Sequence, residues 1–244
     1  MTSKTKKFLS DSERIVFDYK HRNTIRFNIS KYHTSVVAGK KRYSALNDAK
    51  CRAAEVKRHV INQLPNYLEE FESKAHENGI EVLWAEDENE AILHIKNIIV
   101  AEKIKKVVKS KSMTSEEIAF NEVFGELGVE CVETDLGEFI VQNAGEKPYH
   151  ILTPAMHKSR GDVAQLFNKL FGTSKEATAS EMTRFVKGVL RNEFESADMG
   201  LTGANFLLAR EGAVALTENE GNGLFSVSYP RVHVVLAGIE KILP

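Results

Sequence analysis

The chain has 244 residues, 42% of them hydrophobic and 27% charged, which suits a globular protein of one large domain or one domain with an appendage. Its 33 basic and 34 acidic residues leave a net charge of -1, so no global field favours nucleic acid or an anionic membrane, and we expect neither as a partner. No apolar run approaches the ~20 residues of a membrane span, and the first seven residues lack the apolar core of a signal peptide. We therefore expect a cytoplasmic protein without a membrane span.

Residues 1–78 are predicted to form an N-terminal helical segment. Apolar residues recur there at helical spacing, at Val56, Val60, Leu64, Leu68 and Phe71. Pro65 lies inside this pattern and predicts a kink or break near Leu64. The basic stretch from residue 20 to 43 favours a solvated connector over the alternative, a partner-binding arm. Because no long Gly/Ser/Pro linker follows, we expect the helical segment to pack on the remainder of the chain.

Residues 79–244 are predicted to form one α/β domain, because short β-rich runs alternate with amphipathic stretches. We expect strands at residues 81–85, 105–110, 130–133, 150–153, 199–202, 213–217 and 232–237. We expect helices at residues 87–102, 115–127, 160–171 and 180–195. Thr114 and Glu117 are spaced as a capping box at the start of the second helix. The pattern predicts an open, mostly parallel sheet flanked by helices, with its ligand crevice beyond the carboxyl ends of the strands.

The first loop at such a strand end holds Lys109, Ser110, Lys111 and Ser112. Two lysines and two hydroxyls at the start of a helix favour the binding of a phosphate or a carboxylate. The alternative is a surface turn whose lysines face water, since the loop lacks the glycines of a P-loop. We take these four residues as candidate ligand-binding residues.

A second loop follows the predicted strand at residues 199–202. Gly203 permits close approach of a ligand to the backbone, and the side chains of Thr202 and Asn205 can hydrogen-bond it. We place Asp198 at the same strand end, which favours a site over the alternative of a tight turn.

A third loop contains the candidate catalytic residue Glu220, with Gly221 and Asn222 as candidate ligand-binding residues. Carboxylates, carboxamides and glycines at a strand end can supply acid–base or hydrogen-bonding groups. Glu218 is the competing carboxylate, and a plain polar turn is the alternative interpretation.

Arg231 is a further candidate ligand-binding residue, since it places a cation beside the last predicted strand. His233 in that strand is interpreted as a hydrogen-bonded histidine rather than a site residue. We predict no metal site, because neither His157 nor any other histidine shows ligand spacing. Cys51 and Cys131 are too few for an iron–sulfur cluster and are interpreted as free thiols.

Several long motifs in order resemble those of the lactate utilization protein B family, in its N-terminal region, the LUD domain. The motifs occupy residues 108–118, 133–140, 197–205, 219–223 and 230–233. The resemblance implies a fold similar to the NagB/RpiA/CoA-transferase group. It also implies participation in a complex that oxidises L-lactate to pyruvate, with other lactate-utilization subunits as partners. The family's [4Fe-4S] clusters are bound by cysteine motifs in a C-terminal segment that follows this region, so we expect no cofactor within this chain.

Three functions remain open at this point. The leading one is a domain of the lactate-oxidising iron–sulfur complex that binds a small anionic ligand, whether lactate, a nucleotide or a coenzyme A-like molecule. The second is an acyl- or phospho-ligand transferase or ligase with Glu220 as nucleophile or base. The third is a non-catalytic assembly module whose N-terminal helices dock partner subunits.

Overall fold

The computed structural model describes residues 3–244, which divide into two compact units. The first unit comprises the chain up to Leu46 together with Gly137–Val186, and the second unit comprises Asn47–Leu136 together with Lys187–Pro244. No helix within residues 3–244 is both long enough and apolar enough to cross a membrane. The division of the chain into a helical segment at 1–78 and a domain at 79–244 stays a prediction.

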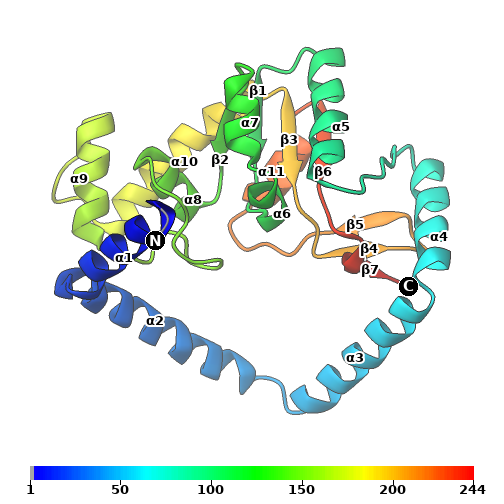
Figure 1. The fold of residues 1–244 in the computed structure, drawn as a ribbon, viewed down its shortest axis with the longest axis horizontal. Coiled ribbons are helices and arrows are strands. Elements are labelled where there is room, and N and C mark those ends of the chain that lie inside the picture. Colours follow the sequence, from blue (N-terminus) through cyan, green and yellow to red (C-terminus); the bar gives the residue numbers. More distant parts are fainter. Residues whose placement is uncertain (1–2) are drawn as a thin grey trace. The chain divides into compact units, whose positions relative to one another are not determined.

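The second unit is built on a four-stranded parallel sheet (Figure 1). Its strands, in the order β2-β1-β3-β6, are Glu130–Glu133, Lys106–Lys109, Met199–Thr202 and Val232–Val235. β1 and β3 are almost wholly buried, as expected of parallel strands covered on both faces. The α/β fold class predicted from the sequence, a mostly parallel sheet flanked by helices, is confirmed.

Helices of the second unit cover this sheet. They are α5 (Glu88–Ala101), α6 (Met113–Glu117), α7 (Phe120–Glu126), α11 (Asn222–Ser228) and the last turns of α10 (Ala179–Ser196), which passes from the first unit into the second at Val186. The apolar core between the helices and the sheet consists of Ile95, Ile99, Ile104, Val107, Ile118, Phe120, Phe124, Val129, Met199 and Leu201. α11 packs so closely on β3 that a Cβ at Gly200 would lie 1.7 Å from the Ser226 carbonyl oxygen. Gly200 is therefore a packing requirement.

A second, three-stranded sheet completes this unit. Its strands, in the order β5-β4-β7, are Ala213–Ala215, Phe206–Leu208 and Ile242–Leu243, and β5 runs antiparallel to β4. It lies with the helices α3 (Leu46–Asn62) and α4 (Leu64–Glu77) and the 3-10 turn η1 (Ile239–Lys241). Their shared core is Val60, Phe71, Ala75, Ala209 and Ile242. The helix break predicted by Pro65 is confirmed, because Gln63 separates α3 from α4.

The first unit is helical. It contains α1 (Ser3–Val16), α2 (Tyr19–Lys40), most of α8 (Leu136–Asn143), α9 (Arg160–Phe171) and the first turns of α10. Phe139 and Phe167 are buried in its core, and the rings of Phe171 and Phe185 contact them or each other. The basic stretch expected to be a connector is instead almost entirely the helix α2.

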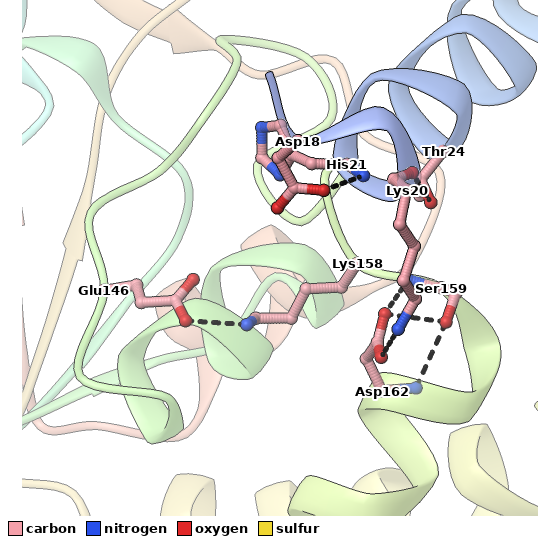
Figure 2. A network of polar contacts seen from close by, with 8 residues as sticks. All are labelled: Asp18, Lys20, His21, Thr24, Glu146, Lys158, Ser159 and Asp162. Atoms are coloured by element: carbon pink, nitrogen blue, oxygen red, sulfur yellow. Dashed lines mark hydrogen bonds and ion pairs between the residues drawn. The ribbon is translucent and has the colours of Figure 1, made fainter. Parts of the chain in front are cut away.

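Polar contacts hold α2 to the rest of the first unit (Figure 2). The Lys20 ammonium lies 3.1 Å from the Asp162 carboxylate, which also closes a capping box with Ser159 at the start of α9. Beside them Lys158 pairs with Glu146 at 2.7 Å. One side of α2 is thus committed to contacts within its own unit.

Some predicted elements were wrong. Residues 81–85 and 150–153 form no strand, and the strand at 213–217 is shorter and belongs to the small sheet rather than the parallel one. The helix at 115–127 is two short helices, because Ala119 adopts a left-handed conformation with φ 50°. The N-cap of α6 is Ser112, whose Oγ accepts from the Ser115 amide, and not Thr114.

Candidate functional site

The strands of the parallel sheet all end at one edge, which we call the carboxyl edge. β1 ends at Lys109, β2 at Glu133 and β3 at Thr202, and the loops that follow them meet there. The pairing continues beyond the strands, since the Ser110 amide donates to the Leu201 carbonyl oxygen at 2.9 Å. This edge is where open α/β sheets bind ligands.

A buried ion pair joins the last residues of β1 and β2 at the carboxyl edge. The Lys109 ammonium lies 2.7 Å from a Glu133 oxygen, and the two residues are 2% and 5% exposed. Lys109 also donates to the Ser115 hydroxyl at 3.1 Å, and Asn121 donates to Glu133 at 2.7 Å. Lys109 therefore joins β1 to β2, and its ammonium does not face solvent.

Two of the predicted loops approach each other beside this pair. A Cβ at Gly203 would lie 3.2 Å from the Ser112 hydroxyl, so the loop after β3 passes close to the loop after β1. Thr202 is fully buried, and its hydroxyl lies 2.9 Å from the His233 Nε2 atom. Partial burial lowers the pKa of His233, which favours the neutral imidazole. His233 is thus a hydrogen-bonded histidine, which agrees with its interpretation from the sequence.

The loop before α11 brings Glu220 to the same edge. Its carboxylate accepts from the Leu136 amide at 3.4 Å, just beyond the end of β2. Burial raises the pKa of Glu220, the charge of Asp135 raises it further, and the nearby Lys111 ammonium opposes both effects. The Lys111 ammonium is itself buried and also acts to lower the pKa of Glu116. A carboxyl group with a raised pKa therefore lies near a buried cation.

The neighbours of Glu220 fix the shape of its loop. Gly221 has φ 81°, a left-handed conformation that suits glycine, and it precedes the first turn of α11. Asn222 donates to the Thr134 hydroxyl at 3.4 Å, which ties the loop to the end of β2. The competing carboxylate Glu218 accepts from the Leu224 amide in the first turn of α11 at 3.1 Å.

Two predicted site residues lie apart from this cluster. The Asn205 side chain accepts from the Thr217 amide at 2.7 Å and closes the β4–β5 hairpin. Arg231 precedes β6, at the opposite or amino edge of the sheet, and its guanidinium pairs with Glu102 at 2.5 Å. Asp198 was wrongly placed beside Thr202, because it precedes β3 and accepts from the Lys105 and Lys106 amides at the amino edge.

Sequence reasoning missed Thr134 and Asp135. Both directly follow β2, and both contact or influence the third loop. The rule that selected the other loops, inspection of each strand's carboxyl end, would have selected these residues as well.

The chain's cysteines do not fit an iron–sulfur cluster, which needs four thiolate ligands. The sequence holds only Cys51 and Cys131. Burial raises the pKa of Cys131 to about 12, so its thiol is neutral near pH 7. Within residues 3–244 no group of three or more histidine, cysteine, aspartate or glutamate side chains is arranged to hold a metal ion.

The parallel sheet, flanked by helices and with polar loops at its carboxyl edge, places the chain in the class of open α/β proteins. Within that class, the chain belongs to the LUD domain family, whose model matches residues 68–244. The resemblance read from the sequence motifs is confirmed.

Curated relatives extend this match. The chain is 38% identical over 193 residues to "Lactate utilization protein B" of Shouchella clausii, covering 79% of this chain and 41% of that protein. It is 37% identical over 193 residues to "Uncharacterized electron transport protein YkgF" of Escherichia coli, with the same coverage. The chain thus spans about two fifths of the length of the curated relatives it matches. No solved structure matches it.

Proposed function

We propose that this chain acts in the oxidation of L-lactate to pyruvate, as the LUD domain of an iron–sulfur protein complex, and that its carboxyl edge binds the hydroxy acid. The observation that carries the proposal is the position of the Glu220 carboxylate, which accepts from the Leu136 amide at the carboxyl edge and lies near the buried Lys111 ammonium. The names of the relatives, lactate utilization and electron transport, support the same reaction.

The geometry suits the chemistry of a 2-hydroxy acid. Lys111 supplies a cation for the substrate carboxylate, and Ser112 and Asn222 add hydrogen-bonding groups. Glu220 accepts the proton of the substrate hydroxyl, and its raised pKa brings it closer to the pH at which it works. Oxidation of lactate to pyruvate breaks the O–H and C2–H bonds: Glu220 takes the hydroxyl proton, and the C2–H bond gives up two electrons to an acceptor elsewhere in the complex and the second proton to solvent. Iron–sulfur clusters held elsewhere in the complex would supply the electron acceptor, since the two cysteines of this chain are too few to bind a cluster.

The test uses the native protein and its partner subunits, purified without oxygen. Cluster absorbance that bleaches on addition of L-lactate is expected, and Glu220→Gln is expected to slow the bleaching by about 100-fold or more, as loss of a general base does. A native complex that contains no iron, or one whose clusters ignore lactate, would contradict the proposal. A thermal shift with coenzyme A esters but not with hydroxy acids would favour a transferase instead.

A further inference from the structure

The charges of this chain are segregated into two segments. Residues 19–46 contain seven lysines or arginines and no acidic residue, whereas residues 69–90 contain nine acidic residues and one lysine. The remainder of the chain holds 25 basic and 25 acidic residues, so it is balanced. The overall net charge of -1 therefore conceals a strongly basic segment and a strongly acidic one of similar magnitude.

Much of the basic segment makes no ion pair or hydrogen bond to the remaining described residues of its own unit. His21, Asn28 and Tyr32 lie on one side of α2 and contact Tyr149, Met156 and His150 of the first unit. Exposed cations lie elsewhere on α2 and directly after it, and within residues 3–244 no ion pair forms at Arg26, Lys40, Lys41 or Arg42. Large apolar side chains lie exposed among these cations, namely Phe27, Val37 and Tyr43.

The acidic segment has the complementary character. It runs along α4, through an extended stretch that pairs with no strand, and into the first turn of α5. Six of its carboxylates are exposed and form no ion pair among the described residues: Glu69, Glu70, Glu81, Glu86, Asp87 and Glu88. Three large apolar side chains, Ile80, Leu83 and Trp84, lie exposed between them.

We propose that two copies of this chain associate through these segments, with residues 19–46 of each copy docked on residues 69–90 of the other. Complementary charge selects the partner and speeds the encounter, while exposed aromatic and aliphatic side chains supply buried apolar contact. The arrangement uses the same pair of surfaces twice, as two-fold dimers do. A nucleic acid or an anionic membrane would engage the basic segment alone and would leave the acidic segment without a partner.

The first test measures mass in solution by sedimentation equilibrium at 50 and 500 mM NaCl. A dimer is expected at low salt, with its dissociation constant raised at least tenfold at high salt, because screening shortens the reach of surface charges. Reversal of the basic segment (Arg26→Glu, Lys41→Glu, Arg42→Glu) or of the acidic segment (Glu69→Lys, Glu70→Lys, Glu81→Lys) is expected to give a monomer. Reversal of exposed lysines outside both segments (Lys96→Glu, Lys175→Glu, Lys187→Glu) is expected to leave the dimer intact.

The decisive variant carries both reversals in one chain, which leaves the net charge unchanged. It is expected to form a dimer again, and so is an equal mixture of the two singly reversed proteins. Melting curves followed by circular dichroism establish that each variant is folded. A wild-type monomer at low salt, a dimer insensitive to either reversal, or a folded double reversal that stays monomeric would overturn the proposal.

Discussion

Replacement of Lys109 by methionine is the sharpest test of the packing beneath the site. Methionine keeps most of the volume but removes the Lys109 ammonium that pairs with the Glu133 carboxylate, which is 5% exposed. Breaking a buried ion pair from one side costs about 3–5 kcal/mol, because the remaining charge stays buried without compensation. For a protein of this size each kcal/mol lowers the melting temperature by roughly 2–4 °C, so Lys109→Met should melt about 6–20 °C below the wild type.

Urea unfolding followed by circular dichroism measures this loss. The matched control is Lys74→Met, which removes an exposed pair with Glu77, where the two side chains are 43% and 59% accessible, and should cost less than about 1 kcal/mol. The double variant Lys109→Met with Glu133→Gln should recover at least half of the loss, because neither member of the pair then carries a charge. A Lys109→Met protein within about 1 kcal/mol of the wild type, or a double variant no more stable than the single one, would refute the reasoning.

Three further predictions follow from local geometry. Gly200→Ala should lose about 1–3 kcal/mol or more of unfolding free energy, because the added Cβ collides with α11. Gly188→Ala should gain about 0.5–1 kcal/mol in urea unfolding, because a Cβ at that position has no atom within 4 Å. Ser112→Ala should lose about 1 kcal/mol of unfolding free energy, because Ser112 is the N-cap of α6. Thr114→Ala should change the unfolding free energy by less than roughly 0.5 kcal/mol. Equal effects of the two substitutions would contradict the assignment of the cap. Although burial opposes it, hydrogen bonds from the Ser159 cap lower the pKa of Asp162 to about 2. The stability that Asp162 contributes is thus complete above its unfolded pKa of roughly 3.9 and is lost as pH falls through about 2. In melts at a series of pH values, the advantage of the wild type over Asp162→Asn should be constant above about pH 5 and shrink below roughly pH 4.

Elements with local signals were predictable from the sequence. The helix α9 occupies the residues predicted for it, 160–171, because the Ser159 capping box begins it and Gly172, in a left-handed conformation, ends it. β3 also has the predicted bounds, since its short apolar run leads directly into the turn at Gly203. The ends of α9 and β3 are thus set by residues within or directly beside each element.

Elements that depend on distant partners were not predictable. Residues 81–85 have strand-like composition but no partner strand, and a strand exists only through pairing. β5 joins β4, which at three residues is too short to recognise in the sequence. Ala119 is a good helix former that nevertheless breaks a helix, so local propensity yields there to the tertiary fold, in which the neighbouring Phe120 is fully buried.

The candidate site likewise combines features that local sequence predicts with contacts that depend on distant residues. The rule that ligands bind beyond strand ends selected Lys109, Ser112 and Glu220, which do lie at the carboxyl edge. It did not reveal that Lys109 is held by Glu133, because that contact follows from the register that pairs these two residues across β1 and β2. Such a register is a non-local property that a single sequence does not display.

The most direct test of the proposed site is the affinity for L-lactate, measured by isothermal titration calorimetry on Lys111→Met and Arg231→Met. Lys111→Met removes a cation from the carboxyl edge, and Arg231→Met removes one from the amino edge of the same sheet. A hydrogen bond to a charged group contributes about 1.5–3 kcal/mol, so Lys111→Met should weaken lactate binding at least tenfold. Arg231→Met should bind lactate as the wild type does. Wild-type affinity in Lys111→Met, or a loss confined to Arg231→Met, would contradict the placement of the site at the carboxyl edge.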